Sequence, residues 1–232
     1  MRVVGCAVRL VGGVVVAVLL SAGSAPAQSG DVGKVLAQMD AAAAKFQSAQ
    51  AEFDWDQYEK IVDEHESQTG TTYFDRKGDS TWMAAHIFKP SEKEVVYKQG
   101  ELQFFQPEID QITIFSAGVN RNQYESFLTL GFGGSGHDLA ANWNVSYQGM
   151  ETIGGVSTAK LDLVPRQDSV KKMFEHVTIW VDLSRAISLK QQFFEPSGDI
   201  RTATYSKIKY NEKVPGSAFE IRKDAKTQIV RK

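Results

Sequence analysis

The sequence predicts a mainly β fold of the α+β class, in which antiparallel strands form a meander, a barrel or a sandwich. Residues 174–210 give the clearest signal, because residues 177–182 and 187–194 alternate with the period of two that strands show. A third strand run follows the turn residues 196–199. Residues 49–116 carry six more strand signals at close spacing, which differs from a βαβ pattern. A meander with one apolar face needs a cover, and what covers it is the functional question.

The first 27 residues have the pattern of a secretory signal peptide that is cleaved before Gln28. Arg2 and Arg9 are the only charges ahead of an apolar run at residues 10–20, and residues 25–27 form an A-x-A cleavage site. An apolar run of this length is too short to cross a bilayer core about 30 Å thick. We therefore expect residues 28–232 to be exported as a soluble protein without a membrane anchor.

Charge and cysteine content exclude several classes of function. Removal of the signal peptide takes away two of the 26 basic residues and leaves 24 against 28 acidic ones, a net charge of −4. This balance argues against broad nucleic-acid binding. The single cysteine, Cys6, leaves with the signal peptide, so the mature chain has no disulfide, thiol nucleophile or thiolate metal ligand.

The mature chain is expected to begin with a helix. Asp31 can cap it, and Val35, Met39 and Phe46 fall on one stripe of a helix that runs to about Ser48. The apolar stripe favours packing on the sheet, and a partner-binding helix is the alternative. The six strands of residues 49–116 then follow, with glycine and proline turns between them.

The middle of the chain changes its pattern. Residues 122–130 have apolar side chains at helical spacing, and residues 131–136 are rich in glycine, which favours a hinge. No linker and no internal repeat interrupts the chain, so residues 28–232 are predicted to form one domain. The remaining expected elements are a short helix at 138–142, strands at 143–148 and 157–164, a helical turn at 169–173, and an edge strand in the basic tail 219–232.

No catalytic, metal or cofactor site is predicted. The four histidines, His65, His86, His137 and His176, show no pair at the spacing of metal ligands. Ser135 stands in Gly-Gly-Ser-Gly-His, which breaks the G-x-S-x-G signature of serine hydrolases at its last position. The same stretch lacks the Lys-Ser/Thr ending of a phosphate loop. We therefore expect a protein that is not an enzyme.

The mature chain has more apolar and aromatic residues than its few helices can cover. It keeps four tryptophans (Trp55, Trp82, Trp143 and Trp180) and thirteen phenylalanines. A curved antiparallel sheet with a helical cover can enclose a cavity for an apolar ligand. The alternative is that these side chains fill an ordinary core.

The order and spacing of several motifs resemble the outer-membrane lipoprotein carrier family, the LolA-like proteins. The first block consists of residues 70–76 (GTTYFDR), 88–91 (FKPS) and 95–107 (VVYKQGELQFFQP). The later block includes residues 161–165 (LDLVP) and 218–221 (AFEI). Together the motifs cover nearly all of the mature chain.

The resemblance implies an incomplete, strongly curved antiparallel β-barrel, covered by a few helices that form a lid over a hydrophobic cavity. It implies a monomeric periplasmic carrier that takes the acyl chains of lipoproteins from an inner-membrane transporter to an outer-membrane receptor. One arginine of the family hydrogen-bonds to the lid and holds the empty cavity shut, and the 70–76 motif places it at Arg76. Lys77-Gly78 and residues 222–224 replace family prolines, and this departure concerns the contacts with the transporter and the receptor more than the fold.

We expect a lid that includes Phe127, Leu128 and Phe132 and is latched by Arg76. The first alternative is a lipid-sensing regulatory or structural periplasmic protein of the same fold. A membrane-anchored receptor would need a lipidated cysteine at the cleavage site, where Gln28 stands, and a periplasmic hydrolase is the least favoured alternative. The expected cavity wall consists of Phe53, Trp55, Trp82, Phe88, Phe104, Phe127, Leu128, Ile179, Leu189 and Phe193.

Overall fold

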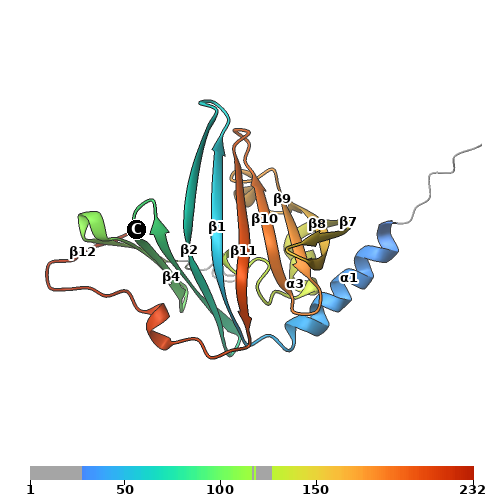
Figure 1. Cartoon of the computed structure of the whole chain (residues 1–232), viewed down its shortest axis with the longest axis horizontal. Coiled ribbons are helices and arrows are strands. Elements are labelled where there is room, and N and C mark those ends of the chain that lie inside the picture. The colour runs from blue at the N-terminus through green and yellow to red at the C-terminus, as the bar shows by residue number, and fades with distance from the viewer. Residues whose placement is uncertain (1–27, 117, 119–126) are drawn as a thin grey trace, which may run out of the picture.

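One open sheet forms the body of the molecule (Figure 1). The structure, a computed structural model, describes residues 28–116, 118 and 127–232. In spatial order the strands are β12 (Gln228–Arg231), β6 (Gln111–Ser116), β5 (Glu101–Gln106), β4 (Lys93–Lys98), β3 (Ser80–Lys89), β2 (Glu64–Lys77), β1 (Ser48–Glu59), β11 (Ile200–Tyr210), β10 (Ile187–Phe194), β9 (His176–Asp182), β8 (Val156–Pro165) and β7 (Trp143–Ile153). Neighbours are antiparallel except β6 and β12, and β12 and β7 are the two edges of the described sheet. The predicted open, curved antiparallel barrel with a few helices is thus confirmed.

The strands β9, β10 and β11 confirm the meander predicted from residues 174–210. Asp182 holds the turn after β9, since its carboxylate accepts bonds from the Ser184 N–H (2.9 Å), the Ser184 hydroxyl (2.6 Å) and Arg185 Nε (2.6 Å). Burial raises the pKa of Asp182, but these hydrogen bonds outweigh burial and hold the pKa below its ordinary value. The turn therefore fixes where β10 begins.

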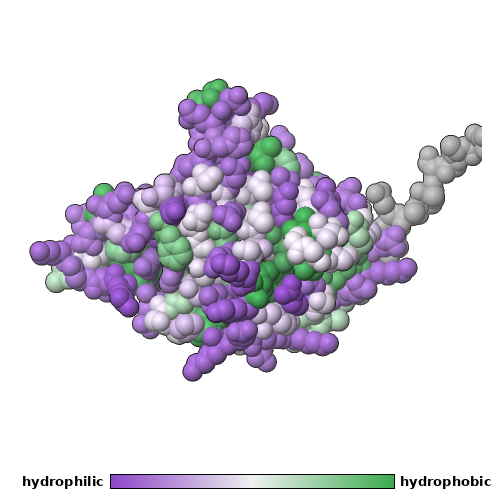
Figure 2. All heavy atoms as spheres, viewed as in Figure 1, coloured by the Kyte–Doolittle hydropathy of each residue, from purple (hydrophilic) through white to green (hydrophobic). Residues whose placement is uncertain are grey.

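The hairpin of β1 and β2 projects beyond the rest of the sheet (Figure 1). β2 pairs with β3 only from Thr69 onward. The residues of β2 before Thr69 are therefore paired with β1 alone. Ile61 and Val62 at the tip are 89% and 54% exposed. Figure 2 shows hydrophobic atoms at the end of this otherwise hydrophilic projection. The hairpin tip therefore lies outside the core.

The strand register divides the sheet into two faces. Directly opposed residues of antiparallel strands point to the same face, so Ile179 shares a face with Gln191, and Gln191 with Ala203. The pairing continues from Ala203 to Trp55 in β1. We call this the inner face, because α1 and residues 127–135 pack on it, and we call the opposite one the outer face.

Helix α1 (Gln28–Ala43) covers one end of the inner face. Val35 and Met39 of this helix are buried in one cluster with Leu161 and Ile179 of the sheet. The apolar stripe predicted from the sequence therefore faces the sheet, as expected of a packed helix.

The boundaries of α1 differ from the predicted ones. The helix begins at Gln28, so Asp31 lies in its first turn and does not cap it. It ends before Ser48, because Ser48 already pairs with Asp75 as the first residue of β1. The other described helices are α3 (Gly136–Asn142), α4 (Asp168–Lys171), η1 (Pro107–Ile109) and η3 (Gly216–Phe219).

The predicted signal peptide and most of the predicted helix at 122–130 lie outside the described residues. Of the helices in the described parts of the chain, none has both the length and the apolar character needed to span a membrane.

Candidate functional site

Residues 127–135, called the lid segment below, lie against the inner face where β10 begins. The Gly133 N–H donates to the Ala186 carbonyl at 2.9 Å, and the Ser188 N–H donates to the Gly131 carbonyl at 2.6 Å. Between them, Phe132 forms an antiparallel bridge with Ile187. The lid segment is thus held on the sheet by backbone bonds, and only its first residues are helical.

Phe132 is the main apolar anchor of the lid segment. Its ring stacks on Phe74 with a centroid distance of 4.0 Å and an interplanar angle of 9°. It also meets Tyr205 edge-on at 4.8 Å and 83°. The side chain is 2% exposed, and burial of a phenylalanine contributes about 1.5–3 kcal/mol. Aromatic pairs of this kind add about 0.5–1.5 kcal/mol.

The beginning of the lid segment has a second apolar anchor. Phe127 packs against Phe174 at a centroid distance of 5.4 Å and against Phe193 at 6.1 Å. Leu128 and Leu130 pack into the two apolar clusters of the inner face. Four apolar side chains of the lid segment therefore cover the inner face.

Arg76 in β2 ties the lid segment to α1. Its Nη1 donates to the Ala43 carbonyl at the end of α1, and its Nη2 donates to the Gly133 carbonyl, both at 2.7 Å. The guanidinium also lies 5.4 Å from the centre of the Phe46 ring. Hydrogen bonds from a charged donor are stronger than neutral ones. One side chain thus joins β2, α1 and the lid segment, which are the contacts that the latch hypothesis requires.

Glycine at position 133 permits this close approach. Its φ is +72°, in the left-handed region that favours glycine. A Cβ at this position would run into the Phe46 ring. The glycine-rich stretch, predicted as a hinge, therefore also lets the backbone of the lid segment pack tightly.

A buried polar pair, Gln191 and Tyr205, lies beneath the lid segment. The Gln191 side-chain nitrogen donates to the Leu130 carbonyl at 2.6 Å, and the Tyr205 hydroxyl donates to Gln191 Oε1 at 3.0 Å. Burial raises the pKa of Tyr205 far above its ordinary value. This pair is not among the site residues predicted from the sequence. The available signal was a glutamine in the apolar alternation of β10, between Leu189 and Phe193.

Most of the predicted wall residues lie on the inner face or on the lid segment. Phe53 is 6% exposed, and the register places Phe53 and Trp55 beside Tyr205 and Ala203. The eight residues that share this location are Phe53, Trp55, Phe104, Phe127, Leu128, Ile179, Leu189 and Phe193.

Trp82 and Phe88 do not share a wall with the other eight residues. Met83 points inward, so its neighbour Trp82 points outward, where it meets Phe219 at a centroid distance of 5.8 Å. Phe88 is 53% exposed. Aromatic character does not decide the face of a strand residue, and strand pairing places Trp82 outside the wall.

A cleft of about 720 Å³ opens beside Arg76. It is lined by α1, the turn between β2 and β3, the lid segment and α3, and Asp79 and Asp138 are among its polar residues. The cleft therefore borders the contacts that join the lid segment to α1.

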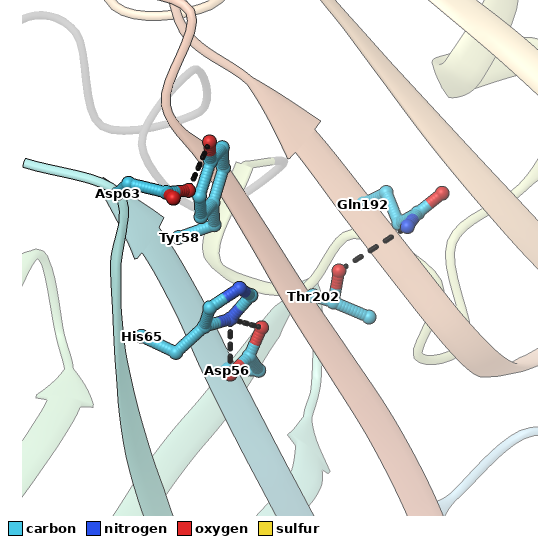
Figure 3. Close-up of polar contacts among 6 residues, drawn as sticks. All are labelled: Asp56, Tyr58, Asp63, His65, Gln192 and Thr202. Atoms are coloured by element: carbon cyan, nitrogen blue, oxygen red, sulfur yellow. Dashed lines mark hydrogen bonds and ion pairs between the residues drawn. The ribbon is translucent and has the colours of Figure 1, made fainter. Parts of the chain in front are cut away.

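His65, His86 and His176 lie on different strands, and each contacts a different partner. In the β1–β2 hairpin, Figure 3 shows His65 beside Asp56, with His65 Nδ1 at 2.9 and 3.1 Å from the two carboxylate oxygens. His176 Nδ1 lies 2.6 Å from an Asp162 oxygen, and His86 Nε2 lies 3.1 Å from a backbone carbonyl. In the described ranges, no group of three or more His, Cys, Asp or Glu side chains is arranged to hold a metal ion.

Ser135 has a structural partner in α3. Its hydroxyl accepts a bond from the Asp138 N–H at 2.9 Å and donates to the Asp138 carboxylate at 2.7 Å. This is the capping geometry of a helix N-terminus. The serine that stands in the broken hydrolase signature thus caps α3.

Comparison with known proteins shows likeness at the level of fold. No protein-family model matches the sequence, and no curated protein matches it. Among solved structures, an uncharacterised conserved protein from Thermus thermophilus is 12% identical with a TM-score of 0.56, over 87% of this chain and 99% of that one. MucB is 15% identical with a TM-score of 0.55, over 87% of this chain and 66% of MucB. In the MucA/MucB complex of Pseudomonas aeruginosa the TM-score is 0.51 at 13% identity, over 83% of this chain and 61% of that one.

A LolA superfamily protein from Nitrosomonas europaea is also among the structural neighbours. It is 15% identical with a TM-score of 0.41, and the match covers 82% of this chain and 97% of that one. At these identities the likeness concerns the fold alone.

Proposed function

We propose that this chain is a periplasmic carrier that binds the acyl chains of lipid-modified proteins, or of related lipids, on its inner face. The observation that carries the proposal is the lid segment. An apolar face is covered by a short segment that four apolar side chains and a few hydrogen bonds hold in place. A cover of this kind can leave the sheet and be replaced by an apolar ligand.

The energies of binding and closing are of comparable size. An acyl chain of about 16 carbons gains roughly 0.8 kcal/mol per buried CH₂, on the order of 10 kcal/mol in total. A carrier must also release this chain, so a competing closed state must recover part of that energy. Return of Phe132 to Phe74 and Tyr205 supplies such a state. A ligand shifts the lid equilibrium only through its different affinity for the open and closed forms.

Arg76 is the latch in this proposal. Its bond to Ala43 holds it beside α1, and its bond to Gly133 exists only when the lid segment is closed, so the Gly133 bond favours release of the ligand. In a transfer pathway, an inner-membrane transporter would load the chain and an outer-membrane receptor would unload it, as the LolA-like resemblance implies. We propose residues 28–232 as the single carrier domain and residues 1–27 as its export signal.

The test is to express the chain from Gln28 onwards and to measure lipid binding directly. Co-purified lipid is identified by mass spectrometry, and affinity is measured by displacement of a fluorescent fatty acid. We expect bound lipid or displacement, and weaker binding by Phe53→Ala on the inner face. Phe88→Ala, at an exposed position outside the apolar clusters of the inner face, is the matched control and is expected to bind normally. Absence of both bound lipid and displacement under all conditions would contradict the proposal.

A second candidate function is regulatory binding of a protein partner. The observation that favours it is the shared fold with MucB, which has been solved in complex with MucA. The chain spans 66% of MucB, so a whole-protein activity of MucB need not carry over. A lipid-sensing regulator would bind the same acyl ligands but would leave them in place when acceptor vesicles are added. Ligand transfer to acceptor vesicles therefore separates the two candidates.

A further inference from the structure

Given the proposed carrier function, we infer that the inner face selects acyl ligands with an ester or amide carbonyl, and that Gln191 recognises this carbonyl. Gln191 lies in β10 between Leu189 and Phe193 and is 4% exposed. Among the residues that the structure describes, it is the one buried side-chain amide. A buried amide in an apolar wall has a strong requirement for hydrogen-bond partners.

In the closed state both ends of this amide are bonded. Nε2 donates to the Leu130 carbonyl at 2.6 Å, and Oε1 accepts from the Tyr205 hydroxyl at 3.0 Å. The orientation is fixed by chemistry, because a backbone carbonyl can only accept, so the amide nitrogen must face Leu130. Tyr205 holds the amide from β11, and the lid segment supplies its acceptor.

The backbone of the lid segment lies directly on the amide. Gly131 has a φ of +76°, and a Cβ at this position would lie 2.8 Å from Gln191 Nε2 and 2.5 Å from the Ser188 Cβ. Glycine therefore allows the peptide at 130–131 to reach the floor of the inner face. The position that its carbonyl occupies is open to a carbonyl of another molecule when the lid segment leaves.

Opening of the lid segment removes one hydrogen-bond partner of the Gln191 amide and keeps the other. Leu130 leaves with the lid segment, whereas Tyr205 stays on the sheet next to β10. The amide nitrogen is then left in a wall that includes Ile179 and Ala203, its cross-strand neighbours. An unpaired buried donor disfavours this open state unless the ligand supplies an acceptor.

An ester or amide carbonyl is the acceptor that fits. An alkyl ether or a plain hydrocarbon chain has no carbonyl to replace that of Leu130. A free carboxylate can accept a bond, but burial of its charge in this wall is costly. The expected ligand class is therefore neutral acyl esters and amides, as found in acylglycerols and in acylated peptides.

A pair of competitors that differ only at the carbonyl tests this inference. The probe is a fluorescent fatty acid, and the competitors are 1-palmitoylglycerol, an ester, and 1-O-hexadecylglycerol, the corresponding ether. We expect the full mature chain to prefer the ester about tenfold, the scale of one unpaired buried donor. Equal displacement by both competitors, together with no carbonyl preference in the peptide pair described below, would overturn the inference and leave the proposed function standing. Displacement by none of the glycerol and peptide competitors, with no co-purified lipid, would overturn both.

Two variants locate the preference in the amide. In Gln191→Met the ester and ether are expected to compete within about twofold of each other, because the donor is gone. Gln192→Met, the next residue on the outer face, is the matched control and should keep the wild-type preference. Tyr205→Phe keeps Gln191 but removes the hydroxyl that orients its amide. The preference for the ester over the ether should therefore become smaller. A full ester preference in folded Gln191→Met would contradict the role of Gln191.

A second arm identifies the source of the acyl group. A dipalmitoylated peptide is compared with its dihexadecyl ether analogue in the same displacement assay. A carbonyl preference in this arm points to lipid-modified proteins, and a preference in the glycerol arm points to free lipids. Either result supports the inference, and absence of a preference in both arms overturns it.

Discussion

Gln191 and Gln192 are neighbours in β10, but their side chains lie on opposite faces of the sheet and differ in exposure and in hydrogen-bond partners. Gln191 is 4% exposed on the inner face and bonds to the lid segment through the Leu130 carbonyl. Gln192 is partly exposed on the outer face, where Figure 3 shows it bonded to Thr202 at 3.2 Å. The inner amide thus takes its acceptor from a removable segment, and the outer amide takes it from an adjacent strand.

The comparison extends to the faces as wholes. Outer-face side chains pair with one another, as Trp180 does by donating to Glu151 at 2.9 Å between Lys160 and Lys190. The inner face is apolar and depends on α1 and the lid segment for cover. The outer face around Trp180 is thus completed by its own polar side chains, whereas the inner face can exchange its cover for a ligand.

The largest difference between the faces is expected in stability. Ile179 is fully buried on the inner face, so Ile179→Ala should lower the free energy of unfolding by about 2–5 kcal/mol. Gln192→Ala on the outer face should change it by no more than about 0.5 kcal/mol. Urea denaturation of the two variants checks this. Similar losses at both sites would show that the two faces do not differ in the way described.

The next effect concerns the latch. Arg76→Leu removes one charge-assisted hydrogen bond to α1 and one to the lid segment, and loss of the second should destabilise the closed lid segment by about 1.5–3 kcal/mol. We expect tighter retention of acyl ligands and slower transfer to acceptor vesicles. Lys77→Leu is the control, because Lys77 pairs with Asp75 outside the latch. Unchanged transfer by Arg76→Leu would remove Arg76 from the latch role.

A smaller effect is expected for the tyrosine beneath the lid segment. Burial raises the pKa of Tyr205 above the ordinary value of about 10, so the folded state keeps a proton that the unfolded chain loses. The stability from this source is fully present below about pH 10 and is lost as pH rises through the folded pKa. Stability measured against pH should therefore fall on the alkaline side, and less steeply in Tyr205→Phe. An identical alkaline slope in both proteins would rule out this coupling.

The smallest effect is expected on the outer face. Lys190 lies 4.7 Å from the Trp180 ring, and a cation–π contact of this kind contributes about 0.5–1 kcal/mol. Lys190→Met should therefore cost less than about 1 kcal/mol in urea denaturation and leave acyl-chain binding unchanged. A clear loss of ligand affinity in this variant would extend the binding site to the outer face.

Local pattern was enough to predict the strands. Period-two alternation predicted β9, β10 and β11, and strand parity within them put Ile179 and Phe193 among the wall residues now found on the inner face. The face of Trp82 was not predictable in this way, because it depends on pairing with strands elsewhere in the chain. Residues with a period of two are equally consistent with either face until register is known.

The polar contacts of the site were harder to predict. The motif resemblance indicated Arg76, but its partners Ala43 and Gly133 are 33 and 57 residues away along the chain. Gln191 and Leu130 are 61 residues apart. Contacts between such distant residues follow from tertiary packing, which neither periodicity nor spacing encodes. Of the helix expected at residues 122–130, the described part is helical at residues 127 and 128 and forms a turn from Thr129, and the glycine-rich residues beyond it make a single bridge to β10.

Amide hydrogen exchange at the lid segment tests the central claim most directly. The Gly133 N–H bonds to Ala186 and the Ser188 N–H bonds to Gly131, so both amides are protected only when the lid segment is closed. Exchange is measured for the mature chain alone and with saturating 1-palmitoylglycerol. If the ligand replaces the lid segment on the inner face, both amides exchange faster in its presence. Equal or greater protection of both amides in the ligand-bound protein would contradict the account.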